Sequence, residues 1–337
     1  MKYPKFLRKG DIIAVTAPSA GITEVDKVLE YENAIKNIKN MGFEFLETEN
    51  VRKYEAGRSE SAQKRAEQFM QVWNNPDVGA IICAAGGDFA CEVLDYLDFD
   101  MLKSIEAKWL QGFSDITNLG YVFTTNLDIA TIYGENIRDY GMNELFENLT
   151  NSIKIMQGEN IIQKSFGFSE SFDDKRKIFE SYNLKNKNTW KIANNAEKIE
   201  FSGRCIGGCF DVIMNLIGTK YDNVKNYIQK YKDDGIVWFF DVFESSTPQL
   251  LCHLWQMKNA GYFEYCKGII LGRPLFIRED YELSFESAVN QALNELNIPI
   301  IFDADIGHLP PQMPIVNGSI LRIKCENGSG EIQTILK

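Results

Sequence analysis

The chain alternates short apolar runs with segments whose apolar residues recur at helical spacing. In its first third, strand-length runs occupy residues 12–17, 43–48 and 78–85. Between them, helices are predicted over 28–41 and 61–73. Because a strand–helix–strand order brings successive strands side by side in the same direction, this pattern predicts a parallel, doubly wound α/β sheet.

The same alternation continues and then resumes after an interruption. A helix over 90–97 and a strand that ends at Gly112 are predicted first, and the later elements are a helix from Phe210, strands over 236–240 and 268–271, and a helix through Trp255. A length of 337 residues suits two domains. The second half is therefore also predicted to be α/β.

A polar stretch rich in Ser, Asn and Lys separates the two halves. Linkers are polar because they make few contacts with either domain. The boundaries are accordingly placed at 1–156 for an N-terminal α/β domain, 157–199 for a linker region and 200–337 for a C-terminal α/β domain.

The charge balance excludes several classes of partner. The chain carries 36 Lys and Arg against 47 Asp and Glu, a formal charge of −11, which repels phosphate backbones and anionic lipid surfaces. No apolar run reaches the length of a membrane span, and the start of the sequence lacks the apolar core of a secretory signal. We therefore expect a cytoplasmic protein without nucleic-acid or membrane partners.

The metal-binding and imidazole chemistry open to this chain is limited. Its seven cysteines are scattered without a CxxC pair, so no zinc site is expected. It has two histidines. His253 lies within a helix with a broad apolar face, which favours a surface or interface role. His308 follows a predicted strand over 298–302 in a loop rich in Gly and Pro, where side chains are often presented to ligands and an imidazole can transfer protons near neutral pH.

A glycine pair marks one candidate site. Gly86 and Gly87 separate a buried strand from a predicted helix, so Gly86, Gly87 and Asp88 could cradle an anion or a developing oxyanion beside the free N–H groups of the helix start. A simple βα turn is the alternative. Cys91 lies in the first turn of that helix, where a thiolate would be stabilised, although the interpretation favoured here is a small buried side chain that packs against the sheet.

Polar residues also follow other predicted strands. Asp241 ends the run 236–240, where it could orient an imidazole or cap the next helix. Ser114 and Asp115 follow the strand that ends at Gly112, and the segment 133–136 has a similar character. Since ligands bind at the carboxyl ends of parallel strands, these residues are predicted to line one crevice.

Taken in order, these segments resemble the LD-carboxypeptidase family of serine peptidases, which includes the microcin C immunity proteins. The resemblance covers nearly the whole chain and is carried by five motifs: Lys9-Gly10-Asp11 through Pro18-Ser19, Arg65 through Gly87 with Asn75-Pro76-Asp77-Val78, Gly112-Phe113-Ser114-Asp115-Ile116-Thr117, Gly207-Gly208 and Gly307-His308.

The resemblance implies both a fold and an activity. Members have a flavodoxin-like or class I glutamine-amidotransferase-like N-terminal domain and a C-terminal domain of swivelling β/β/α type. They hydrolyse the amide that joins a terminal D-alanine to a diamino acid in murein peptides, or an aminoacyl-nucleotide amide. A homodimer is implied, and no metal or organic cofactor is needed.

At two positions of the implied Ser, Glu and His triad, the sequence departs from the family pattern. Counted from Gly86-Gly87, the nucleophile position falls on Ala90, whose methyl group cannot attack a carbonyl. Counted back from the segment 255–261, the glutamate position falls on Asp241, whereas His308 is retained.

Several explanations of Ala90 stay open. It could be an engineered change, although the second departure argues against that, or it could mark a natural divergent branch. Cys91 could have taken over as nucleophile, although one helical step turns a side chain by about 100°. A water activated by His308 needs no side-chain nucleophile.

Two functional hypotheses follow from the sequence. In the first, the protein is an active hydrolase of a small peptide or peptide-nucleotide, with His308 as base and acid, Asp241 as its orienting group and amides near Gly87 and Cys91 as oxyanion donors. In the second, it is a non-hydrolytic relative that keeps the cleft and binds muropeptides or peptide-nucleotides.

Overall fold

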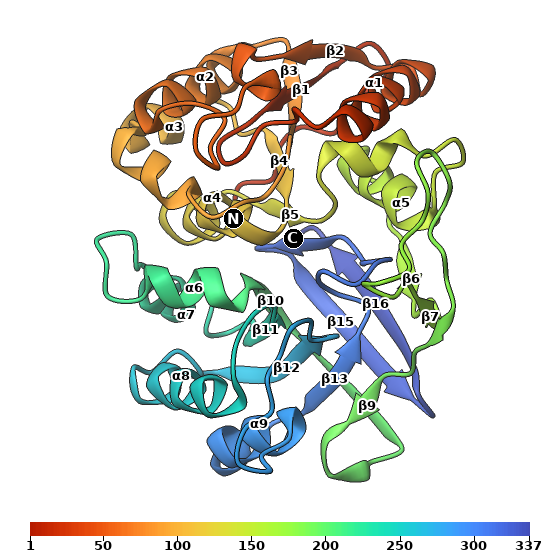
Figure 1. Ribbon diagram of the computed structural model, residues 1–337. Coiled ribbons are helices and arrows are strands. Elements are labelled where there is room, and N and C mark those ends of the chain that lie inside the picture. Colours follow the sequence, from red (N-terminus) through yellow and green to blue (C-terminus); the bar gives the residue numbers. More distant parts are fainter.

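The computed structural model describes residues 1–337, apart from the side chain of Asn195. Its two halves are stacked, with the N-terminal half in red to yellow above the C-terminal half in green to blue (Figure 1). Each half is built around its own mixed sheet with helices packed against it. The predicted two-part α/β architecture is therefore confirmed.

The first sheet has the strand order β14-β5-β4-β3-β1-β2. Its strands are β1 (Ile12–Thr16), β2 (Glu44–Glu47), β3 (Val78–Cys83), β4 (Trp109–Gly112), β5 (Thr131–Tyr133) and β14 (Ile315–Asn317). β1 to β5 are parallel and β14 is antiparallel to β5. The order 2-1-3-4-5 is that of flavodoxin-like folds, in which ligands bind at the carboxyl ends of the strands where the order reverses, here beside β1 and β3.

Alternate residues of the central strand face different helices. Ile81 of β3 belongs to an apolar cluster with Phe69 of α2, whereas Ile82 packs in a second cluster with Ile38 of α1. The helices of this half are α1 (Val25–Asn40), α2 (Ala62–Asn74), α3 (Phe99–Ser104), α4 (Thr117–Val122) and α5 (Glu147–Met156). Because both faces of the sheet are covered, its strands read as continuous apolar runs.

The predicted α-helix over 90–97 is instead a 3₁₀ helix, Ala90–Tyr96. A tighter helix of this kind is used in short pieces and connections. The peptide N–H of Ala90 at its start donates to the carboxylate of Asp115, at 2.7 Å. That amide is therefore occupied by the protein itself.

The second sheet has the order β6-β16-β15-β10-β11-β12-β13-β9. Its strands are β6 (Ile162–Lys164), β9 (Lys191–Ile192), β10 (Lys198–Cys209), β11 (Ile236–Asp241), β12 (Cys266–Gly272), β13 (Ile300–Ala304), β15 (Ile320–Glu326) and β16 (Ser329–Ile335), and its helices are α6 (Phe210–Leu216), α7 (Val224–Lys230), α8 (Thr247–Asn259) and α9 (Phe285–Leu293). β10 to β13 are parallel. Their carboxyl ends carry the C-terminal part of the site.

Two structural connections cross the domain boundaries that were placed from the sequence. The stretch 157–199 contributes β6 and β9 to the edges of the second sheet, and also forms the small hairpin of β7 (Phe168–Ser169) and β8 (Asn186–Lys187). β14 crosses back from the C-terminal half to the first sheet. Among the described residues, no helix combines the length and apolar character that crossing a bilayer requires.

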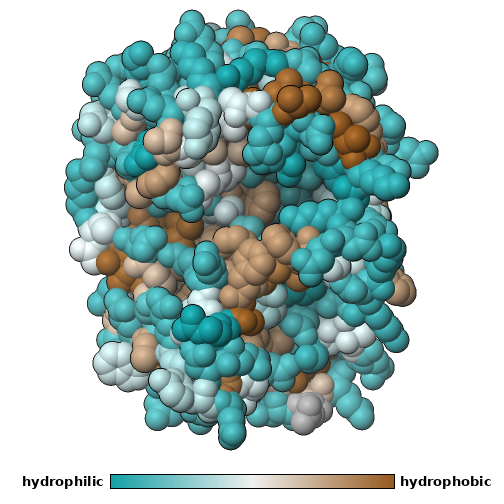
Figure 2. Space-filling model, in the orientation of Figure 1, coloured by the Kyte–Doolittle hydropathy of each residue, from teal (hydrophilic) through white to brown (hydrophobic). Residues whose placement is uncertain are grey.

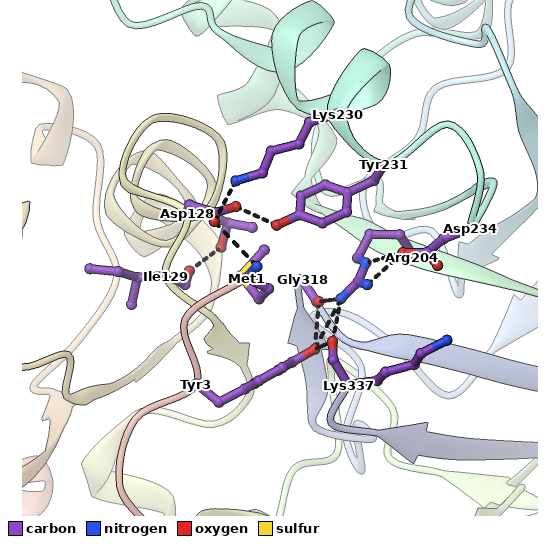
Figure 3. A network of polar contacts seen from close by, with 11 residues as sticks. Met1, Tyr3, Asp128, Ile129, Arg204, Lys230, Tyr231, Asp234, Gly318 and Lys337 are labelled. Carbon is purple, nitrogen blue, oxygen red and sulfur yellow. Dashed lines mark hydrogen bonds and ion pairs between the residues drawn. The ribbon is translucent and has the colours of Figure 1, made fainter.

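Polar contacts near the two ends of the chain join the halves (Figure 3). Asp128 of the first half accepts hydrogen bonds from Lys230, at 2.7 Å, and Tyr231, at 2.5 Å. Arg204 on β10 donates to the carbonyl of Lys337 at 2.9 Å, and the hydroxyl of Tyr3 donates to that carbonyl at the same distance. These contacts fix one half against the other, so strand ends from both sheets can share a single site.

Candidate active site

Three side chains from distant parts of the chain form a linear arrangement between the halves. The hydroxyl oxygen of Ser114 lies 3.0 Å from Nε2 of His308. On the other side of the ring, Nδ1 of His308 lies 2.7 Å from Oδ2 of Asp241. A hydroxyl, an imidazole and a carboxylate in this order form the nucleophile, base and orienting group of a serine hydrolase triad.

Ser114 is held on a sharp turn directly after β4. Its φ is +61°, a left-handed conformation that residues other than glycine seldom adopt. The short helix Ser114–Ile116 and then α4 follow it. A serine on a strained strand-to-helix turn is typical of nucleophile elbows, which present the hydroxyl at the top of a sheet.

His308 follows β13 and is clamped between aromatic rings. Its imidazole stacks on Phe243 with a centroid distance of 4.0 Å and an interplanar angle of 26°. Phe113, the neighbour of Ser114, meets the ring edge-on at 5.2 Å. The His308 side chain is 13% exposed, so the rings restrict its rotation while one edge stays accessible from the cleft.

Asp241 ends β11 and is fully buried. Its Oδ2 accepts a hydrogen bond from the hydroxyl of Tyr133, at 2.5 Å. Its contact with His308 is close, but it is not aligned as a regular hydrogen bond, so the contact is better described as an ion pair when the imidazole is protonated. Oδ1 has no hydrogen-bond partner among the described residues.

The backbone of the glycine pair, Gly86 and Gly87, packs closely against the turn that carries Ser114. A Cβ built on Gly86 would lie 3.2 Å from Oγ of Ser114, so a larger residue there would press on the reactive atom. Gly87 has a φ of +147°, and a Cβ there would meet the hydroxyl of Ser19 at 2.5 Å. Both positions therefore require glycine for close backbone packing.

Asp115 lies behind this turn. It is 3% exposed, and its carboxylate accepts from the hydroxyl of Ser19 at 2.5 Å, from the N–H of Ala90 and from Asn118 at 2.8 Å. Burial raises the pKa of Asp115, and the donated hydrogen bonds partly offset this. The carboxylate ties together the segments that follow β1, β3 and β4.

A cavity of about 610 Å³ opens at this point. It is lined by residues from the segments after β1, β2, β3, β4 and β5, by one residue of α1 and by His308: Ala20–Glu24, Lys27, Tyr54, Gly57, Ala84–Asp88, Phe113, Ser114, Asn136, Arg138 and Asp139. Figure 2 shows apolar residues at the centre and middle left of one face and a further apolar group at its upper right, within a largely hydrophilic surface. The carboxyl ends of the first sheet thus meet the second half at the cavity.

The structure brings most of the predicted site residues together. His308, Ser114, Gly86, Gly87 and Asp88 line the cavity. Asp241 contacts His308 from within the core, and Asp115 supports the wall from behind. These residues come from both halves, as the crevice prediction required.

Two predicted residues lie apart from this arrangement. Ala90 is buried and is absent from the lining of the cavity. Cys91 is exposed as a residue, but partial desolvation of its thiol and the nearby acidic groups Asp115 and Glu92 raise its pKa, which disfavours the thiolate at neutral pH. The hydroxyl that lies within hydrogen-bond distance of His308 is that of Ser114, which the sequence analysis had placed only in the wall of the crevice.

No cluster of three or more His, Cys, Asp or Glu side chains suited to a metal ion occurs among the described residues. His253 lies on α8, with its ring 6.1 Å from that of Phe210, and burial lowers its pKa.

Comparison with known families decides the assignment. Residues 13–134 match the model of the LD-carboxypeptidase N-terminal domain, and residues 202–323 match that of the C-terminal domain. The chain belongs to the LD-carboxypeptidase family. The family resemblance drawn from the motifs is thereby confirmed.

Relatives within the LD-carboxypeptidase family match over almost the full length. A putative carboxypeptidase of Vibrio cholerae is 25% identical, with 93% of this chain and 92% of the relative covered. The microcin C7 self-immunity protein MccF of Escherichia coli is also 25% identical, with 95% and 92% covered. A crystal structure of an MccF-like protein from Bacillus anthracis superposes with a TM-score of 0.82 over 100% of both chains at 22% identity, which supports the fold.

Proposed function

We propose that this protein is a serine hydrolase of amide bonds in which Ser114 is the nucleophile. The observation that carries this proposal is the contact of Ser114 with His308, because it supplies the hydroxyl that the family chemistry needs without involving Ala90. It favours hydrolysis over the binding-only hypothesis, which rested on a missing nucleophile.

The proposed reaction has two stages. Oγ of Ser114 attacks the amide carbon while Nε2 of His308 takes the hydroxyl proton, and an Oγ–C bond forms. His308 then gives that proton to the nitrogen of the leaving amine as the C–N bond breaks. Water, deprotonated by His308, then bonds to the acyl carbon, the Oγ–C bond breaks, the acyl group leaves as a carboxylic acid and the proton on His308 returns to Oγ. Backbone N–H groups at the Gly86-Gly87 turn and at the start of the helix after Ser114 are the proposed oxyanion donors.

The cavity wall supports a zwitterionic peptide as substrate. Its charged side chains have both signs: Lys27 and Arg138 are basic, whereas Glu24, Asp88 and Asp139 are acidic. A murein peptide with a terminal D-alanine carries a carboxylate and the ammonium group of a diamino acid, which such a mixed wall can pair. We therefore propose the amide to the terminal D-alanine as the bond that is cut, as in murein peptide recycling.

An aminoacyl-nucleotide amide is the second candidate substrate. A structure of MccF, 21% identical and with a TM-score of 0.80, is described as a complex with aspartyl sulfamoyl adenosine. In this chain, the ring of Phe243 packs against Phe276, and the rings of Phe276 and Phe172 lie 4.5 Å apart. Both Phe276 and Phe172 are exposed. Exposed rings of this kind can stack on a planar base.

A homodimer and a cytoplasmic location, both implied at the sequence level, stay predictions.

The test is hydrolysis by the purified protein. An L,D-linked murein tetrapeptide and an aminoacyl sulfamoyl adenosine are each incubated with the wild-type protein and with Ser114→Ala, and released D-alanine or amino acid is quantified. We expect D-alanine release by the wild type and at least ~10³-fold slower release by the variant. Tight binding of the tetrapeptide without hydrolysis would overturn the proposal in favour of a binding protein.

A further inference from the structure

Tyr133 is neither a member of the triad nor part of the cavity lining. It ends β5 and pairs in register with Gly112, two residues before Ser114. Its ring packs against Phe239 at 5.4 Å and Phe113 at 6.3 Å, and it is 2% exposed. The hydroxyl is thereby fixed deep beneath the turn that carries Ser114.

This hydroxyl joins two ends of the triad. It donates to Oδ2 of Asp241 at 2.5 Å and accepts from the peptide N–H of Ser114 at 3.4 Å. Together with the contacts of His308, these bonds close a circuit from the backbone of Ser114 through Tyr133, Asp241 and His308 to the Ser114 hydroxyl. The position of the carboxylate is thus linked to that of the nucleophile.

The Asp241 carboxylate depends on Tyr133 for its hydrogen bonding. Tyr133 makes the one hydrogen bond to the Asp241 side chain among the described residues, and Oδ1 is buried without a partner. The backbone of Gly307 packs directly against that oxygen. An unanchored buried carboxylate would rotate or lose its charge, and either change would release the imidazole.

We propose that Tyr133 is a positioning residue that anchors the Asp241 carboxylate so that Oδ2 faces Nδ1 of His308. This role deepens the proposed function and rests on it. Burial and the neighbouring Asp241 raise the pKa of Tyr133 well above its usual range, so its hydroxyl stays a donor throughout the working pH range.

Removal of this donor has a predictable effect on His308. With the hydroxyl gone, the Asp241 carboxylate keeps no hydrogen-bond donor among the described residues, so it can turn away from Nδ1 of His308 and leave the imidazole without its orienting group. The other titratable groups that face the carboxylate are Cys209, at the end of β10, and Asp211, in the first turn of α6. Arg138, Asp139 and Glu135 border the cavity beside His308. All of these are unchanged by a substitution at Tyr133, so a difference between two variants isolates the hydroxyl.

The experiment measures the reactivity of the Ser114 hydroxyl, which depends on the position of His308 and its carboxylate. Phosphonylation of Ser114 by diisopropyl fluorophosphate is followed by mass spectrometry in the wild type, in Tyr133→Phe and in the matched control Tyr140→Phe. Tyr140 is likewise buried, and its hydroxyl accepts a hydrogen bond from Gln111, away from the triad. The phenylalanine retains the ring packing at each position, and thermal unfolding checks that both variants are folded.

We expect phosphonylation of Ser114 to be at least ~10-fold slower in Tyr133→Phe than in Tyr140→Phe, which is expected to react at the wild-type rate. Equal labelling rates in the two folded variants would overturn the proposal. A wild-type protein that is not labelled on Ser114 would contradict the proposed function, so the two failures are distinguishable. In a second measurement, Tyr133→Phe is expected to lower kcat for amide hydrolysis at least ~10-fold with KM unchanged, whereas Tyr140→Phe keeps both values. Equal rates would contradict a positioning role.

Discussion

The hydroxyl of Ser114 lies 3.0 Å from Nε2 of His308 although the two residues are 194 positions apart in the chain. Ser114 follows a strand of the first sheet and His308 follows a strand of the second, so neither half contains the pair alone. The proposed catalytic geometry therefore depends on the contacts that hold the halves together.

Three substitutions separate the candidate nucleophiles. Ser114→Ala is expected to lower the rate of amide hydrolysis by ~10³-fold or more, because no other hydroxyl contacts His308. Cys91→Ala is expected to retain full activity, since this thiol is exposed and its pKa is raised. Ala90→Ser is expected to leave activity unchanged, because Ala90 does not line the cavity. Steady-state kinetics of the three variants measure these effects. Loss of activity in Cys91→Ala would contradict the assignment of Ser114 as the nucleophile.

Gly307 is a sensitive position beside the triad. Its φ is +104°, and a Cβ at this residue would collide with the carboxylate of Asp241. Gly307→Ala is therefore expected to lower kcat at least ~10-fold by displacing that carboxylate. The matched control is Gly218→Ala, where φ is +79° and a Cβ meets nothing within 4 Å. The control is expected to lose about 1 kcal/mol of unfolding free energy and no activity. Equal activity losses in the two variants would point to general strain instead.

Arg65 is predicted to stabilise the glycine turn. Its side chain is fully buried and donates to the carbonyls of Pro18, at 2.7 Å, and Phe89, at 3.0 Å, which follow β1 and β3. Arg65→Met should lower the unfolding free energy by about 2–4 kcal/mol, because buried carbonyls lose their donors. Arg52→Met removes an arginine that is 37% exposed and is expected to cost less than about 1 kcal/mol. Urea unfolding of both variants checks this order, and equal losses would contradict it.

Glu135 gives the stability a predictable pH dependence. Burial raises its pKa well above the ordinary value of 4.5. The unfolded chain therefore loses this proton at a lower pH than the folded protein, and this group's contribution to the unfolding free energy falls as pH rises between the two pKa values. Glu135→Gln removes that loss. Its unfolding free energy relative to the wild type is expected to be constant below about pH 4 and to increase above it, by about 1.4 kcal/mol for each unit of pKa shift. Urea unfolding at several pH values measures the difference, and parallel pH profiles would rule out this contribution.

The strands could be predicted from the sequence because the buried parallel strands are continuous apolar runs. The runs at 78–85 and 236–240 became β3 and β11, each within two residues of the predicted bounds. The helix over 90–97 was predicted with the wrong type, because apolar spacing in so short a segment does not distinguish a 3₁₀ helix from an α-helix.

Only part of the site could be predicted from the sequence. Strand ends identified His308, Asp241 and Ser114 as members of one crevice, but counting from Gly86-Gly87 along the chain drew attention to Ala90. The available signal was a serine directly after a strand and before a helix, at Gly112-Phe113-Ser114-Asp115. The anchoring bond from Tyr133 to Asp241 joins the two halves, so no local pattern could have indicated it.

Covalent labelling tests the central assignment most directly. Diisopropyl fluorophosphate forms an oxygen–phosphorus bond with an activated serine as fluoride leaves, and peptide mass spectrometry locates the adduct. We predict a single adduct on Ser114 in the wild-type protein and its loss in His308→Ala. An unlabelled wild-type protein, or an adduct on any other residue, would contradict the assignment of Ser114 as the nucleophile.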